Sequence, residues 1–263
     1  GKFSVEVPVG VDAQAKLLWK NQGLLQRLER APNERALEKL GAYSTEVHPQ
    51  NAHLVASRYQ DSADINGAQG DGRSVYLGTF RGGLYGAYEA QLKGCGPTPL
   101  AWKGHAFHED GWVSFQRTLW ETSIADELHR LGFEAPEVLA IYRTGSRTVD
   151  NTERSWPAAT ALRLSSTHFR LGHLRRFSHG KKAQATFLGL LQHVGRTTLS
   201  PEFSATAVHD RVALVERFAR NLGLDIGKCD ALNIHCFHPT LGNVRVDGHL
   251  LDFSTVRFFR HYV

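Results

Sequence analysis

The chain is poor in cysteine, and it lacks methionine and any long apolar run. Only three of its 263 residues are cysteines, Cys95, Cys229 and Cys236, and no two of them form a Cys-x-x-Cys pair. This count argues against a disulfide framework and favours a reducing compartment. No run of about 18 apolar residues is present, so a membrane span is not expected. Because the first residues also lack the apolar core of a signal peptide, the sequence predicts a cytoplasmic protein.

Histidine content and net charge limit which metals and binding partners are expected. The 14 histidines include no His-Glu-x-x-His motif and no Cys/His spacing of a zinc site, so most are expected to be solvated. The net charge of +5 is mild. It suits a polyanion such as ATP and would equally suit weak contact with nucleic acid. Neither nucleic acid nor a membrane is expected as the main partner.

The most informative pattern lies near the C-terminus, in residues 242–254. Asp247-Gly248 between two short apolar runs predicts a hairpin with a two-residue turn. Counting outward from that turn sets Asn243 opposite Asp252. A carboxamide and a carboxylate are hard oxygen ligands that suit a Mg²⁺ carrying nucleotide phosphates, and protein kinases use this order of residues. The alternative is an ordinary surface hairpin with polar ends.

The remaining pattern predicts strands with one helix, followed by helices. Strands are expected within 53–93 and at 138–142 and 158–164, and helices at 12–40, 115–131, 183–195 and 208–222. Gly132 is expected to end the second of these helices. The order of elements is that of a kinase-like β-rich small lobe, a helical large lobe and a hairpin.

A glycine-rich turn precedes the strands at 74–93. In this turn Gly70 and Gly72 flank an aspartate, and Arg73 follows directly. Glycines between strands allow backbone amides to approach phosphates, and a guanidinium binds phosphate through two parallel N–H groups. The alternative is a plain turn without a ligand.

Lys93 ends the strand expected at 88–93, about twenty residues after the glycine turn, where kinases place the lysine that contacts ATP phosphates. Glu121 falls on the apolar side of the helix 115–131, where a carboxylate is costly unless it is paired. Lys93 is the partner expected by analogy with the kinase lysine–glutamate pair. Arg117, one helical turn earlier, is the alternative partner.

Arg163 and Arg170 lie seven residues apart, on either side of a small polar segment that contains Ser166 and His168. Two arginines so placed can converge on one phosphate group. The alternative is a solvated basic edge.

Together these segments resemble the selenoprotein O (SelO) family of kinase-fold protein AMPylators. The resemblance covers the chain from about residue 42 to its end, and its most specific part is Leu-Lys-Gly-x-Gly-Pro-Thr-Pro at 92–99. It implies a bilobal, kinase-like α+β fold with a metal-binding hairpin. The expected organisation is a helical N-terminal extension at 1–41, a small lobe at 42–164 and a reduced large lobe at 165–263.

The resemblance also implies a role for each motif. AMP, rather than phosphate, would move from a flipped ATP onto a hydroxyl group of a protein or small molecule, with Mg²⁺, or alternatively Mn²⁺, as the metal. Lys93 and Glu121 would form the catalytic ion pair, and Asn243 and Asp252 would bind the metal. The residues expected to contact the nucleotide are Gly70, Gly72, Arg73, Lys93, Arg163 and Arg170.

The chain departs from the family pattern in two ways. An acidic residue, the proposed catalytic base, normally precedes the metal-binding asparagine, but Gly242 stands there. His238 or His235 is the expected substitute, since a neutral imidazole accepts a proton near pH 7. The chain is also shorter than family members typically are, which predicts a compact or truncated relative. Ordinary phosphoryl transfer and a nucleotide-binding pseudoenzyme scaffold remain alternatives, the latter favoured by Gly242.

Overall fold

The computed structural model describes residues 4–47, 52–59, 70–82, 86–101, 110–149, 154–177, 181–235, 240–251 and 256–258. These residues form two compact units. The first comprises the described residues within 1–58, 64–122 and 136–166, and the second those within 59–63, 123–135 and 167–263.

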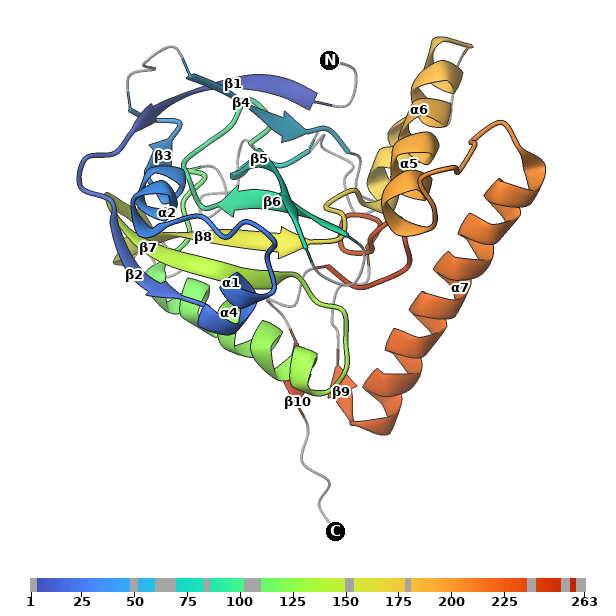
Figure 1. The fold of residues 1–263 in the computed structure, drawn as a ribbon. Helices are drawn as coiled ribbons and strands as arrows, with labels where there is room; N and C mark the ends of the chain where they lie inside the picture. The colour runs from blue at the N-terminus through green and yellow to red at the C-terminus, as the bar shows by residue number, and fades with distance from the viewer. Residues whose placement is uncertain are drawn as a thin grey trace. The chain divides into compact units, whose positions relative to one another are not determined.

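The first unit is built on one antiparallel sheet of eight strands, in the order β2-β7-β8-β6-β5-β4-β1-β3 (Figure 1). The strands are β1 (Ser4–Val11), β2 (Lys16–Lys20), β3 (Tyr43–Ser44), β4 (Ala52–Ser57), β5 (Ser74–Arg81), β6 (Ala87–Lys93), β7 (Glu137–Val149) and β8 (Ser155–Ser165). Two short helices, α1 (Gln22–Gln26) and α2 (Glu34–Gly41), also belong to this unit. The large antiparallel sheet and the helices confirm the predicted α+β class.

Strand β6 is buried on both of its faces, and the two faces differ in character. Ala90 and Leu92 lie on one face, in the apolar core of the unit. The alternation of a strand places Gln91 and Lys93 on the other face. Both of these polar side chains are nevertheless almost inaccessible to solvent. A buried polar face requires partners for every donor and acceptor, and the candidate site is built around it.

Helix α4 (Phe115–Arg130) confirms the helix expected at 115–131. It ends as predicted at Gly132, whose φ is +79°, and the N–H of Phe133 returns to the carbonyl of Leu128 at 2.9 Å. In the first unit Phe115 packs against the apolar residues of β7 and β8. The apolar side expected from the sequence included Leu119, and it is wrong there. Leu119 is 41% exposed, because the buried side runs through residues such as Thr118 and Thr122.

The second unit is mainly helical. It contains the C-terminal part of α4 together with α5 (Leu171–Phe177), α6 (Lys181–Thr198), α7 (Val208–Ala231), β9 (Ile234–His235) and β10 (Arg257–Phe258). Its core joins side chains from α4, α7 and the hairpin at 244–250, among them Leu128, Phe133, Val244 and Leu250. Helices α6 and α7 confirm the two helices expected at 183–195 and 208–222, and both are longer than expected.

The N-terminal prediction was wrong. Residues 12–40 do not form one helix, because Lys16–Lys20 is an edge strand that pairs with β7 and only short helices follow. The apolar pair Leu17-Leu18 suits either period, and the neighbouring edge of β7 decided between them. The expected helical extension at 1–41 is therefore corrected. The boundary between lobes at residues 164 and 165 stays a prediction.

None of the helices formed by the described residues is both long enough and apolar enough to cross a membrane.

Candidate functional site

The first unit contains a buried ion pair between β6 and α4. The ammonium group of Lys93 contacts the carboxylate Oε2 of Glu121, and their side chains are only 7% and 15% exposed. The other carboxylate oxygen of Glu121 accepts a hydrogen bond from Nε of Arg117 at 3.0 Å. Both partners considered for Glu121 are therefore used at once. Because burial makes a lone charge costly, each charge here depends on the others.

Arg163 lies beside this pair, on the neighbouring strand β8. It is the direct cross-strand partner of Gln91, and its Nη2 donates to the Gln91 side-chain oxygen. The Gln91 amide nitrogen in turn donates to Oδ2 of Asp71 at 3.0 Å. Asp71 also accepts a hydrogen bond from the hydroxyl of Ser57. Neither Gln91 nor Asp71 was among the predicted site residues, although Asp71 lies in the glycine turn and Gln91 in the strand expected at 88–93.

The glycine turn has a packing role that the structure makes clear. Gly70 has a φ of +147°, and a Cβ there would lie 2.0 Å from the carbonyl oxygen of Ser57. A Cβ on Gly72 would lie 2.7 Å from the Cα of Ala101. Only glycine allows these backbone segments to approach so closely. Contact of Gly70, Gly72 and Arg73 with phosphates stays a prediction.

Arg170 belongs to the second unit and is 8% exposed. Its Nη1 donates to the carbonyl of Gly242 at 2.7 Å and to the hydroxyl of Tyr59 at 3.1 Å, and its guanidinium lies 4.5 Å from the centre of the Tyr59 ring. Its backbone N–H donates to Nδ1 of His173 at 2.9 Å. Burial, followed by the charge of Arg170, lowers the pKa of His173 to about 3, so this imidazole is neutral. Arg170 is thus held from both its backbone and its side chain.

The hairpin near the C-terminus exists, but its register differs from the prediction by one residue. Val244 pairs with Leu250, and the N–H of Leu251 donates to the carbonyl of Asn243 at 2.9 Å. Asn243 is therefore opposite Leu251 and not Asp252. The connection contains three residues and ends at Gly248, whose φ of +97° is typical of such a turn. An aspartate–glycine pair signals both turn types, which explains the error.

The fully buried Arg245 explains why the turn adopts this register. Its Nε donates to Oδ1 of Asp247 at 2.9 Å and its Nη2 to the other carboxylate oxygen, while Nη2 also reaches Oε1 of Glu134 at 3.1 Å. Burial alone would raise the pKa of Asp247, but the contacting guanidinium outweighs burial and lowers it. Burial would likewise lower the pKa of Arg245, and the two carboxylates raise it instead. Turning Asp247 inward completes this ion cluster.

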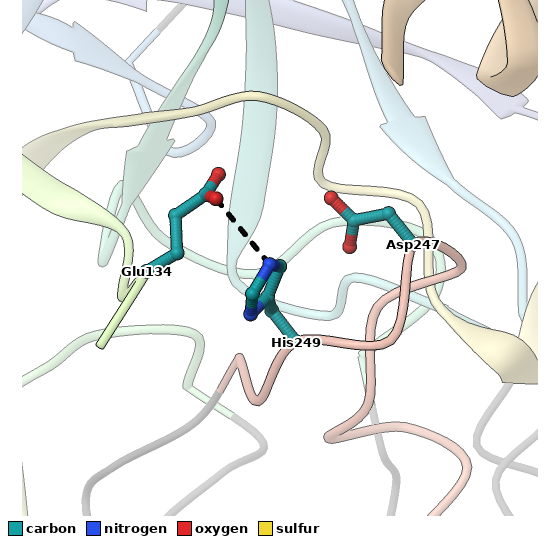
Figure 2. A group of neighbouring side chains, drawn as sticks. All are labelled: Glu134, Asp247 and His249. Carbon is teal, nitrogen blue, oxygen red and sulfur yellow. Dashed lines mark ion pairs between the residues drawn. The ribbon is translucent and has the colours of Figure 1, made fainter. Parts of the chain in front are cut away.

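Glu134, Asp247 and His249 are residue types that bind metal ions, and one ligand atom of each lies within 4.8 Å of those of the others. Figure 2 shows the three side chains. Nε2 of His249 lies 3.3 Å from Glu134, and Nδ1 lies 3.1 Å from Asp225. However, the guanidinium of Arg245 contacts both Glu134 and Asp247. A cation in the cluster would lie beside that fixed positive charge. We therefore assign the cluster a structural role in holding the hairpin.

Cys95 is fully buried in the apolar core of the first unit, and burial raises the pKa of its thiol to about 12. A protonated thiol is a poor nucleophile and a poor metal ligand, so Cys95 is a packing residue. Two predicted site residues, His238 and Asp252, lie outside the described residues. Asn243 is described, and its N–H donates to the carbonyl of Thr240 at 2.8 Å.

A strand lysine paired with a helix glutamate, in a unit built on a large antiparallel sheet, is the arrangement of kinase-like nucleotide-binding proteins. The chain also matches a known protein family. The family model described as protein adenylyltransferase SelO matches residues 1–222. The chain therefore belongs to the SelO family, as its motifs predicted.

Similar proteins share the name protein nucleotidyltransferase YdiU. The protein of Shewanella pealeana is 29% identical over 259 residues, which are 97% of this chain and 51% of that protein. That of Shewanella oneidensis is 37% identical over 183 residues, or 70% and 36% of the two chains. That of Bacillus cereus is 25% identical over 266 residues, or 99% and 52%. The chain thus spans about half the length of the curated relatives it matches.

Proposed function

We propose that this chain binds Mg-ATP and transfers AMP to a hydroxyl group, as a SelO-like adenylyltransferase. The observation that carries the proposal is the Lys93–Glu121 ion pair. Lys93 is the last residue of β6. The Gly-x-Gly-Pro-Thr-Pro segment follows directly, and it is the part of the chain most specific to the family. A lysine paired with a largely buried carboxylate is restrained from turning into solvent, and it presents its charge at a fixed place.

The reaction that we propose is a displacement at the α-phosphorus of ATP. The hydroxyl oxygen of the acceptor bonds to that phosphorus, the bond to the bridging oxygen breaks, and pyrophosphate leaves. Such transfers depend mainly on positioning and on neutralising phosphate charge. Lys93, Arg163 and Arg170 would supply that charge. We assign the two arginines to the terminal phosphate, because a guanidinium fits a phosphate through paired N–H groups.

The proposal includes a divalent metal at Asn243 and Asp252. Carboxamide and carboxylate oxygens are the donors that Mg²⁺ and Mn²⁺ take, and hydrogen bonds fix the backbone of Asn243 on both sides. When bound, the metal would offset charge on the phosphates. Asp252→Asn should therefore abolish metal-dependent nucleotide binding without unfolding the chain.

The proton of the attacking hydroxyl has no acidic acceptor at position 242. Gly242 contributes only a backbone carbonyl, and Arg170 already donates to it. We propose that His238 accepts the proton. His238→Gln should then lower the turnover rate while leaving ATP binding unchanged. The acceptor would be a hydroxyl-bearing protein or small molecule, and the sparse cysteine content supports a cytoplasmic reaction.

The position of a radioactive label in ATP tests this function. The protein is incubated with Mg²⁺, or with Mn²⁺ in a parallel sample, and a soluble protein extract as acceptor. Transfer of label from α-labelled ATP, and none from γ-labelled ATP, is expected. Transfer from the γ position would instead indicate a kinase. Lys93→Met should abolish transfer, and Arg117→Met should reduce it much less, because Glu121 then keeps Lys93 as its partner.

A nucleotide-binding scaffold without turnover is the second candidate. Gly242 favours it, because a catalytic base is absent at that position. ATP binding in isothermal titration calorimetry without transfer of either label would establish this alternative. Arg163→Ala and Arg170→Ala should weaken ATP binding more than AMP binding under either reading, since AMP lacks the terminal phosphate.

A further inference from the structure

Gln91 makes its closest contact with a residue that the proposed function uses. It is the cross-strand partner of Arg163 in the β6–β8 ladder, so the two side chains share one face of the sheet. Nη2 of Arg163 donates to Oε1 of Gln91. Both side chains are buried, at 2% and 9% exposure. Arg163 can therefore change its orientation only by breaking this hydrogen bond.

Asp71 determines which end of the Gln91 amide faces Arg163. A carboxylate only accepts hydrogen bonds, so the amide nitrogen of Gln91 must turn toward Asp71, which it contacts at 3.0 Å. The amide oxygen then faces Arg163. Asp71 is itself held, because Ser57 donates to its carboxylate and the Thr98 hydroxyl donates to its backbone carbonyl at 2.7 Å.

An amide suits position 91 better than a carboxylate or an apolar group. Glutamate could not donate to Asp71 and would place two carboxylates side by side. Leucine would offer no acceptor to Arg163, and methionine only a weak one. A neutral amide oxygen fixes the guanidinium without adding a negative charge to a group that is to meet a phosphate.

We infer that Gln91 is a positioning residue, which is oriented by Asp71 and fixes the guanidinium of Arg163 for the terminal phosphate of ATP. The inference rests on the proposed function, and it extends the site to two residues that do not touch the nucleotide. A small misplacement of a phosphate ligand weakens its contact strongly, so removal of Gln91 should have an effect on ATP similar to that of removing Arg163.

The test compares ATP and AMP binding by isothermal titration calorimetry. Gln91→Met should weaken ATP binding about tenfold, a loss of about 1.4 kcal/mol, and leave AMP binding within about twofold. In an Arg163→Met background the same change should have almost no further effect, because Gln91 acts through Arg163. Full additivity of the two changes would overturn the inference.

Gln192→Met is the matched control. Gln192 also uses both ends of its amide, since it donates to the carbonyl of Phe203 and accepts from the N–H of Ala205 at 2.9 Å. It lies in the second unit, whereas Arg163 belongs to the first. The control should lose comparable stability in urea and keep its ATP affinity. Equal losses of ATP affinity in Gln91→Met and Gln192→Met would contradict a positioning role.

Conservative replacement of Asp71 supplies a second, independent variant. Asp71→Asn keeps an oxygen that can accept from Gln91, so ATP binding should remain near the wild-type value. Asp71→Leu removes that oxygen and should reproduce the tenfold loss seen with Gln91→Met. Equal ATP binding by the asparagine and leucine variants would show that Asp71 does not orient Gln91.

Guanidinium NMR separates failure of this inference from failure of the proposed function. In the ligand-free protein, Arg163 should give a slowly rotating guanidinium signal that Gln91→Met broadens or shifts and Gln192→Met does not. An unaltered signal in Gln91→Met overturns the positioning role even if ATP binds. A wild-type chain that binds no ATP in the presence of Mg²⁺ overturns the proposed function, and with it the role of Arg163 toward phosphate.

Discussion

The two units hold their buried polar residues in different ways. In the first unit, Gln91 and Lys93 occupy alternate positions on one strand, and their partners come from β8, α4 and the glycine turn. In the second unit, the buried Arg245 is enclosed by the carboxylate of its own turn and by Glu134 from the segment after α4. A strand directs its side chains alternately to its two faces, so their direction follows from their position in the sequence. In a turn, the direction of a side chain depends on the contacts that it makes with the rest of the fold.

The difference has an energetic consequence. Glu121 in the first unit has two cationic partners and some exposure to solvent. When one partner is removed, the other partner and the solvent still stabilise its charge. Arg245 and Asp247 in the second unit are at most 1% exposed and neutralise each other directly. Loss of one of them leaves the charge of the other in a place that solvent hardly reaches. The second unit should therefore be the more fragile of the two.

Removal of Arg245 should give the largest effect. Arg245→Met leaves Asp247 and Glu134 buried without their guanidinium, and we expect a loss of about 3–5 kcal/mol in the free energy of unfolding in urea. The double change Arg245→Met, Asp247→Leu should recover part of that loss, because no buried charge of the pair remains. A single variant as stable as the wild type would contradict the structural role of the cluster.

One glycine with positive φ in each unit allows the cost of adding a side chain to be compared between the units. A Cβ added to Gly248 in the hairpin would lie only 2.2 Å from the carbonyl oxygen of Phe218. A Cβ added to Gly78 in β5 would have no neighbouring atom within 4 Å among the described residues. Gly248→Ala combines strain with a clash and should cost about 2–4 kcal/mol. Gly78→Ala should cost about 1 kcal/mol from strain alone. Equal costs in urea unfolding would mean that the hairpin adjusts freely.

Acid and alkali should act on different units. The pKa of His173 is lowered to about 3 in the folded chain. Below about pH 6.5 the unfolded chain therefore binds more protons than the folded chain, and stability falls. At pH 5 the expected loss in the free energy of unfolding is about 2 kcal/mol relative to pH 8. Asp247, whose folded pKa is also lowered, adds a further loss below about pH 4. Hydrogen exchange should therefore quicken first in the second unit.

A matched variant isolates the contribution of His173. His173→Asn keeps an acceptor for the N–H of Arg170 and removes the titrating ring, so its stability should depend less on pH between 5 and about 6.5. In the first unit, the raised pKa of Cys95 gives stability that is present below about pH 9 and is lost as the pH rises toward 12. Loss of protection in the first unit at pH 5, with the second unit unchanged, would reverse the comparison.

Among the ion pairs, the smallest effects on stability are expected for the two partners of Glu121. Lys93→Met should cost about 1–2 kcal/mol, because Arg117 continues to pair with Glu121. Arg117→Met should cost about 0.5 kcal/mol, as is usual for a partly exposed pair one helical turn apart. ATP binding should separate the two variants more sharply than urea unfolding does. A greater loss of ATP binding in Arg117→Met than in Lys93→Met would remove Lys93 from the site.

Much of the first unit followed from sequence patterns. The alternation at 88–93 predicted β6, and the cost of burying a lone carboxylate led to the pairing of Glu121 with Lys93 or Arg117. Helix α4 and its glycine end were predicted because a 3.6-residue period and a positive φ are local properties. The motifs also predicted membership of the SelO family. Local chemistry therefore determined the elements, the class of protein and several of the residues that matter.

Only the tertiary structure decided which residues close over one another. Residues 16–20 became a strand because an open edge of β7 was available, although their leucines also suit a helix. The hairpin adopted a three-residue turn because Asp247 could reach Arg245 and Gly248 could approach Phe218. Gln91 gained its orientation from Asp71, twenty positions earlier in the chain. These outcomes depend on contacts between distant segments, and no local period or motif encodes such contacts.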